Sequence, residues 1–209
     1  MRIAVDPEKP EESAKKMFFL RIRRKINFLL GRRNWSEDEF FLESWKGRIK
    51  VLASLLKDEA SILDLGCGMQ WLKEFIPDHI EYYPVDFKKR TSDIIVCDFN
   101  KKQFPNIKSD VAFISGCLEY VNDTSWFISE ISKSCSTALC SYSSLEKFPD
   151  IKFRKTWMWV NHLTRDQVID LFYSYGMELT AEGDFPGQEI FRFDKRQQTN
   201  NCWHKQIYI

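Results

Sequence analysis

The feature that most constrains the fold is a short apolar run that ends in a glycine-containing turn. It spans residues 61–71 and has the sequence SILDLGCGMQW, with helix-forming residues directly after the turn. A backbone without side chains can lie against a flat, polar ligand at the carboxyl end of a parallel strand. The pattern therefore predicts a strand, a turn and a helix that together bind a cofactor.

Two acidic residues accompany this turn. Asp64 lies inside the apolar run, where an unpaired carboxylate would be costly, so we expect it to order the glycine turn or to contact a cationic group of the ligand. Asp86 ends the next strand-like run, over 80–85. An acid about 20 residues beyond a glycine turn can accept hydrogen bonds from ribose hydroxyls. The two acids thus favour a nucleoside-containing cofactor.

Length and composition exclude several classes of protein. A chain of 209 residues predicts one domain with an accessory segment. The 31 Lys and Arg balance 30 Asp and Glu, so net charge gives no support to general nucleic-acid binding. The six cysteines form no Cys-x-x-Cys pair, which favours reduced, buried thiols over disulfides or zinc ligands. No apolar run approaches the ~20 residues of a membrane span, and the charged N-terminus is unlike a secretory signal. These features predict a cytoplasmic protein.

The first part of the chain predicts a helical extension over residues 1–57. After a tail of about 13 residues, 14–30 has helical periodicity, and basic residues from Lys15 to Arg33 cover its other faces. These basic residues form either a solvated face or a surface for anionic membrane or a phosphorylated acceptor. Ser36 to Glu39 is a capping-box pattern that predicts a second helix running to about Leu56.

Beyond residue 58 the chain alternates strand-like and helix-like segments. The predicted strands are 61–65, 80–85, 94–97, 110–115 and 136–142, and the predicted helices are 70–76, 122–134 and 165–175. Such alternation is typical of a doubly wound, mostly parallel α/β sheet. The last helix begins with a capping box at Thr164.

The C-terminal part departs from this alternation. Two strands are predicted at 177–183 and 188–193, joined into a hairpin by a turn at 184–187. Residues 203–209 could add another strand. Residues 145–163 lack a clear period and contain tryptophans, which indicates either a lid over a pocket or simple packing.

Two common nucleotide-binding fingerprints do not match. A Walker phosphate loop needs Gly-Lys-Ser/Thr, which the chain lacks. The dinucleotide fingerprint needs a third glycine where this chain has Trp71. The sequence therefore disfavours a P-loop enzyme and a nicotinamide or flavin enzyme.

An ordered set of motifs instead resembles the class I S-adenosylmethionine-dependent methyltransferases, over about residues 45–194. LDLGCG at 63–68 resembles their first motif, and Asp86 stands at the position where the family has its ribose-binding acid. CDF at 97–99 resembles the adenine-contacting motif, and DVAFISGCLEYV at 110–121 resembles the fourth strand and its exit loop. The resemblance implies a Rossmann-like, seven-stranded sheet with an antiparallel terminal strand, formed by a methyltransferase domain over 58–209.

The resemblance also implies which residues contact S-adenosyl-L-methionine. Gln70 stands where many family members have a third glycine, a substitution that is tolerated if the side chain points away from the cofactor or contacts its amino-acid end. The implied cofactor-binding residues are Asp64, Gly66, Cys67, Gly68, Gln70, Asp86, Phe87, Asp98, Phe99, Ser115 and Gly116. No metal is implied.

The implied activity is methyl transfer to an oxygen or nitrogen of a small-molecule or glycan-like acceptor. A nucleophile with a high pKa benefits from a general base, and the candidate catalytic residues are Glu119, Tyr120 and His162. Glu119 could instead hold the methionine moiety, and Tyr120 could pack under the cofactor.

Two other readings of the same residues stay open. One is a non-catalytic S-adenosylmethionine-binding regulatory or partner protein, because the residues on the nucleophile side are poorly defined. The other is a methyltransferase that the basic residues from Lys15 to Arg33 bring to a membrane surface or to RNA, although no nucleic-acid module is recognisable.

Overall fold

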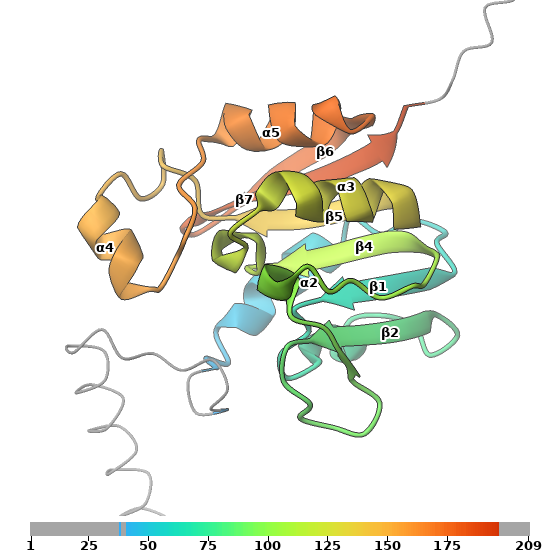
Figure 1. Cartoon of the computed structure of the whole chain (residues 1–209). Coiled ribbons are helices and arrows are strands. Elements are labelled where there is room, and N and C mark those ends of the chain that lie inside the picture. The colour runs from blue at the N-terminus through green and yellow to red at the C-terminus, as the bar shows by residue number, and fades with distance from the viewer. Residues whose placement is uncertain (1–37, 39–40, 197–209) are drawn as a thin grey trace, which may run out of the picture.

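The computed structural model describes residue 38 and residues 41–196, which form a seven-stranded sheet with helices on both faces (Figure 1). The strand order is β3-β2-β1-β4-β5-β7-β6. Five strands are parallel, and the hairpin of β6 and β7 is antiparallel, with β7 placed beside β5. The strands are β1 (Ser61–Leu65), β2 (Glu81–Asp86), β3 (Ile95–Val96), β4 (Ser109–Ser115), β5 (Cys135–Tyr142), β6 (Met177–Phe185) and β7 (Gln188–Lys195). The predicted fold class is confirmed.

The helices form one layer on each face of the sheet, and a further helix lies beyond one end of the sheet. Helices α3 and α5 cover one face, α2 lies on the other, and α4 lies beyond the ends toward which β4 and β5 run (Figure 1). Within residues 41–196, three short 3-10 helices occupy loops. The helical elements are α2 (Trp45–Ala53), η2 (Trp71–Glu74), η3 (Phe99–Lys101), η4 (Leu118–Tyr120), α3 (Thr124–Ser134), α4 (Ile151–Thr156) and α5 (Arg165–Ser174).

Local sequence explains where these helices begin and end. The predicted capping box at the start of α5 is present, because Thr164 and Gln167 exchange side-chain and backbone hydrogen bonds. Gly176, with φ +78°, follows the end of α5 in the left-handed region that glycine adopts without strain. Asp123 caps α3 by accepting a hydrogen bond from the backbone N–H of Trp126 (2.9 Å).

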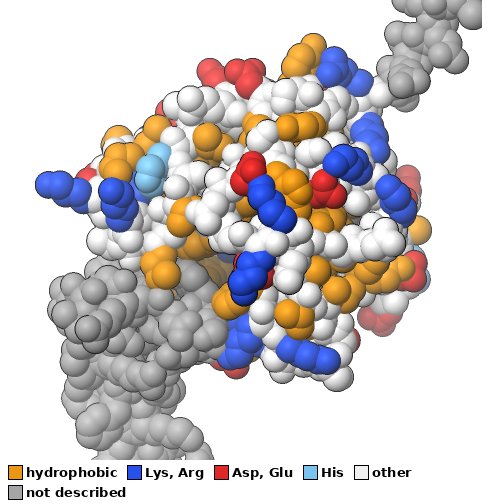
Figure 2. All heavy atoms as spheres, in the orientation of Figure 1, with side chains coloured by type: hydrophobic (Ala, Val, Ile, Leu, Met, Phe, Trp, Pro, Cys, Tyr) orange, Lys and Arg blue, Asp and Glu red, His pale blue; other side chains and the backbone are white. Residues whose placement is uncertain are grey.

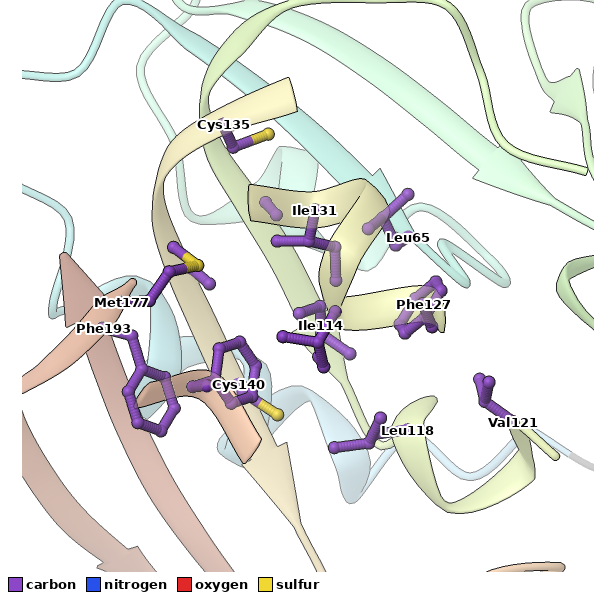
Figure 3. Packing of buried hydrophobic residues seen from close by; sticks show 14 of the residues in the cluster. Leu65, Ile114, Leu118, Val121, Phe127, Ile131, Cys135, Cys140, Met177 and Phe193 are labelled. Atoms are coloured by element: carbon purple, nitrogen blue, oxygen red, sulfur yellow. The ribbon is translucent and has the colours of Figure 1, made fainter. Parts of the chain in front are cut away.

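The sheet buries apolar side chains on both faces, as its parallel strands require. Alternate residues of β4 enter opposite cores: Ala112 and Ile114 pack with α3 and α5, whereas Val111 and Phe113 pack with α2. Figure 3 shows Ile114 with Phe127 and Ile131 in the first of these cores. The strand ends that form the site are therefore held from both sides.

Two sequence predictions need correction in this part of the chain. The helix predicted to run to about Leu56 from the capping box at residue 36 is wrong at 41–44, because α2 begins only at Trp45 and ends at Ala53. The non-helical segment lets the ring of Phe41 pack beside Trp71 and under the guanidinium of Arg90. The segment predicted as a helix over 70–76 holds only the single 3-10 turn η2.

Other predictions fall on residues that the structure does not describe. These are the tail, the basic helix at 14–30, the start of the second helix, and the strand at 203–209, so the boundary of the N-terminal extension stays a prediction. Among the described cysteines, all five are free thiols and four are buried. Within 38 and 41–196, no helix is long and apolar enough to cross a membrane. Figure 2 shows Lys, Arg, Asp and Glu side chains interspersed over one face of the described part, without a surface of a single charge.

Candidate active site

The glycine turn after β1 is tied to the end of β2. The backbone N–H groups of Gly66 and Cys67 both donate to the carbonyl of Val85 (2.8 and 3.0 Å), and that of Gly68 donates to Asp86 Oδ2 (2.9 Å). Gly66 has φ +81°, and a Cβ there would lie 2.6 Å from Cys117 Sγ. Only glycine can therefore occupy this position without strain.

A cavity of about 410 Å³ opens at this turn, at the carboxyl ends of the parallel strands. Its volume is within the ~300–1,000 Å³ of small-molecule sites. Its wall combines the glycine turn, the ends of β2 and β4, residues of α2, and an aromatic group from the segment 143–160 and the β6–β7 turn. The position matches the rule that doubly wound sheets bind ligands outside the carboxyl ends of their strands.

Most of the residues expected to bind the cofactor meet in this cavity. Two of the three candidate catalytic residues, Glu119 and Tyr120, also line it. The lining cofactor-binding candidates are Asp64, Gly66, Cys67, Gly68, Asp86, Phe87, Ser115 and Gly116.

Four predicted residues do not line the cavity. The amide of Gln70, a residue with φ 56°, donates instead to Thr91 Oγ1 (2.6 Å). Asp98 caps η3, and Phe99 packs against the ring of Phe127 with centroids 4.7 Å apart. His162 Nδ1 accepts a hydrogen bond from Nε of Arg154 (3.0 Å). Their proposed roles in binding or catalysis stay predictions.

Asp64 is a buried carboxyl group in the cavity wall. The pKa of Asp64 is raised to about 7, mainly by burial and to a smaller extent by the charge of Asp86. A hydrogen bond from the Tyr82 hydroxyl (2.5 Å) lowers the pKa, but by less than burial raises it. Burial also raises the pKa of the Tyr82 hydroxyl, so Tyr82 stays a donor at neutral pH. The Asp64 carboxyl thus titrates near neutrality at the base of the turn.

Asp86, only 4% exposed, has hydrogen bonds to both carboxylate oxygens. Oδ2 accepts from Gly68, and Oδ1 accepts from the backbone N–H of Lys88 and from Arg90 Nη1, both at 3.0 Å. Arg90 in turn donates to Asp38 Oδ1 (2.9 Å). A carboxylate has about four acceptor positions, so Asp86 retains capacity for a ligand hydroxyl.

Glu119 is the most buried acid of the cavity, at 1% exposed. Its Oε1 accepts from the backbone N–H of Ser143 (2.8 Å) and from Gln188 Nε2 (3.3 Å), whereas Oε2 has no hydrogen-bond partner among the described residues. Burial raises the pKa of this carboxyl, and the charge of Arg48 lowers it by less. The neighbouring Tyr120 hydroxyl accepts a hydrogen bond from Trp159 Nε1 (3.1 Å).

Three polar residues of the cavity, Arg48, Ser143 and Gln188, were not predicted from the sequence. Arg48, on α2, donates from Nε to Ser115 Oγ (3.0 Å) and lies so close to Gly116 that a Cβ there would be 2.8 Å from its guanidinium carbon. A signal existed, because Arg48 shares a helical face with Leu52 at i+4. Gln188 follows the hairpin turn, and nothing in its local sequence distinguishes it.

The segment 143–163 is held over the site by one buried cation. Arg154 of α4 is fully buried, and its guanidinium donates to the carbonyls of Ser143 (2.7 Å) and Ser144 (3.0 Å) as well as to His162. Its guanidinium carbon also lies 4.8 Å from the ring centre of Trp159. Arg154 therefore fixes the segment that supplies the aromatic side of the cavity.

Comparison with solved structures identifies the fold. A chain from the complex between a methyltransferase activator and a methyltransferase of Haloferax volcanii superposes with a TM-score of 0.59, at 14% identity over 73% of this chain and 90% of that chain. The 1,6-didemethyltoxoflavin-N1-methyltransferase of Burkholderia thailandensis, with bound 1,6-didemethyltoxoflavin and S-adenosylhomocysteine, gives 0.56, at 14% identity over 93% and 94% of the two chains. This chain has the class I methyltransferase fold.

A further solved structure agrees with this methyltransferase fold. A methyltransferase of Thermotoga maritima gives a TM-score of 0.57, at 13% identity over 85% of this chain and 98% of that chain. No protein-family model and no curated protein sequence matches the chain. The methyltransferase fold is thus established by three-dimensional likeness at low sequence identity.

Proposed function

We propose that this chain transfers a methyl group from S-adenosylmethionine to an oxygen or nitrogen atom of a small-molecule acceptor. The observation that carries the proposal is a cavity that brings together the glycine turn, the Asp86 carboxylate and the buried Glu119 carboxylate. The toxoflavin-type neighbour, which was crystallised with S-adenosylhomocysteine and its small acceptor, supports both the cofactor and the class of acceptor.

The residues present suit this cofactor. The turn at Gly66 and Gly68 offers bare backbone, and Asp86 has acceptor capacity for a ribose hydroxyl. The buried guanidinium of Arg48, near Ser115 and Gly116, provides a positive charge for the cofactor's carboxylate. Phe87, 48% exposed beside Asp86, provides an apolar face for the adenine ring.

When bound, S-adenosylmethionine supplies an electrophilic methyl group on a sulfonium sulfur. The chain has to orient the acceptor and exclude water, which alone can supply much of the rate. The acceptor lone pair forms the new bond to the methyl carbon as the carbon–sulfur bond breaks, and the electron pair of that broken bond stays on sulfur. We assign Glu119 Oε2 to take the proton that the acceptor releases, because this oxygen has no other partner among the described residues.

The test is formation of S-adenosylhomocysteine from S-adenosylmethionine across a panel of phenols, amines and sugars, with calorimetric titration of the cofactor on the same protein. Acceptor-dependent product supports the proposal. Cofactor binding without product across the panel would instead favour a regulatory or partner protein. If neither the donor nor the product binds, the proposal is wrong.

A further inference from the structure

One side of the cavity is built almost entirely from aromatic rings. Phe148 and Trp159 pack edge to face with centroids 5.4 Å apart, and Phe148 stacks on Phe153 at 5.5 Å. Trp157 and Trp159 are stacked at 6.3 Å, which makes the cluster continuous along the segment 143–160. Such a surface offers flat, polarizable faces to a ligand.

Two buried acceptor oxygens lie in the wall of the same cavity. Glu119 Oε2 and Gln188 Oε1 have no hydrogen-bond partner among the described residues, although both side chains are more than nine-tenths buried. The two groups are adjacent, because Gln188 Nε2 donates to Glu119 Oε1 (3.3 Å). An unsatisfied buried acceptor costs about 1–3 kcal/mol, so this pair points to a ligand that brings hydrogen-bond donors.

Two serine hydroxyls nearby each accept a hydrogen bond from a neighbouring side chain. Ser115 Oγ accepts from Arg48, and Ser143 Oγ accepts from Gln188 Nε2 (3.0 Å). A sugar would bring several hydroxyl groups against a wall that is mostly aromatic, where few polar groups could accept or donate hydrogen bonds to them. Burial raises the pKa of Glu119 by more than the charge of Arg48 lowers it, so a neutral donor suits this carboxyl group and the ligand need not be a cation.

We infer that the acceptor is a planar aromatic or heteroaromatic molecule with hydroxyl or N–H donors. It stacks on the partly exposed rings of the cluster, those of Phe148, Phe153 and Trp157, and donates to Glu119 Oε2 and Gln188 Oε1. This inference rests on the proposed function for the methyl transfer itself. It narrows the acceptor to one chemical class and assigns Gln188 to acceptor recognition.

The experiment measures binding of three probes by calorimetry, with and without saturating S-adenosylhomocysteine. The first, 5-hydroxyindole, has a flat ring and two donors. The second, 5-methoxy-1-methylindole, keeps the ring but has no donor, and the third is methyl α-D-glucopyranoside. We expect 5-hydroxyindole to bind at least about tenfold more tightly than either of the others.

Variants measure separately how ring stacking and the ligand's hydrogen-bond donors contribute to binding. Gln188→Leu should reduce the preference for 5-hydroxyindole over its methylated analogue by about fivefold or more, whereas Gln103→Leu, at an exposed glutamine outside the cavity lining, should leave it unchanged. Phe153→Leu, at a 38% exposed ring of the cavity lining, should weaken both indoles by a similar factor. Thermal unfolding of each variant checks that it is folded.

Several results would overturn the inference. These are equal binding of the two indoles, tighter binding of the sugar, or no indole binding in either condition. Failure of the proposed function is separate, because it is read from the titration of S-adenosylhomocysteine itself, and the probes are also measured without it.

Discussion

Replacing Asp64 by asparagine should stabilise the protein at alkaline pH. Burial raises the pKa of this carboxyl from 3.8 to about 7, and each pKa unit corresponds to about 1.4 kcal/mol. Above pH 7 the folded protein therefore loses about 4 kcal/mol of unfolding free energy by holding an ionised group in its interior. Asparagine keeps the shape and an acceptor for the Tyr82 hydroxyl without the charge.

The sign follows from proton binding. Between pH 3.8 and about 7 the folded protein holds a proton on Asp64 that the unfolded chain has released, so the free-energy cost falls as the pH falls. Below 3.8 the group is protonated in both states, and the cost is gone. The advantage of Asp64→Asn should be about 4 kcal/mol at pH 8.5 and about 1 kcal/mol at pH 4.5.

Urea unfolding at the two pH values measures this difference. Asp166→Asn is a matched control, because the Asp166 side chain is 85% exposed, and it should change stability little at either pH. In a Tyr82→Phe background, the advantage of Asp64→Asn at pH 8.5 should be larger, since the hydrogen bond that stabilises the ionised carboxyl is gone. A gain for Asp64→Asn that is absent, or equal at both pH values, would show that Asp64 is not a buried carboxyl group with a raised pKa.

Four further predictions concern the site. Gly66→Ala should lower the unfolding free energy by about 1–3 kcal/mol in urea titrations, because its Cβ would meet Cys117 Sγ at 2.6 Å; an unchanged midpoint contradicts this. Arg154→Met should cost about 3 kcal/mol and expose the segment 143–163 to limited proteolysis, because buried carbonyls lose their donor; wild-type protease resistance would exclude that role. Glu119→Gln should lower kcat by a factor of about 10²–10⁴ and leave the affinity for the cofactor unchanged. The kcat of the wild type should rise with pH, with an inflection above 4.5, the ordinary pKa of a glutamate carboxyl group. His162→Ala should keep kcat within about threefold, because this side chain contacts Arg154 and does not line the cavity; a hundredfold loss would instead identify it as the base.

Local signals were sufficient for the fold and for the part of the cavity around the glycine turn. The glycine turn, the alternation of strands and helices, and the capping box at Thr164 each act over a few residues, and the structure confirms each of them. Asp64 and Asp86 could be placed together because the carboxyl ends of neighbouring parallel strands meet at one edge of a sheet.

The aromatic side of the cavity was much less predictable, because it depends on contacts between distant segments. Gln188 reaches Glu119 across 69 positions of sequence, and no local pattern encodes that approach. For the segment 145–163, the sequence left open whether it forms a lid or simply packs. The buried Arg154 that fixes this segment resembles any surface arginine in sequence. The helix expected to run to Leu56 from residue 36 starts late because the packing of Phe41 on Trp71 outweighs the local capping pattern.

The most direct test of the central claim is calorimetric titration of S-adenosylmethionine into the wild-type protein, Asp86→Ala and the exposed control Asp166→Ala. The account predicts saturable binding to the wild type and to the control. Binding to Asp86→Ala should be at least about tenfold weaker, because the lost carboxylate orders the turn through Gly68 and is the proposed acceptor for a ribose hydroxyl. Equal affinity for all three proteins, or no binding to the wild type, would contradict it.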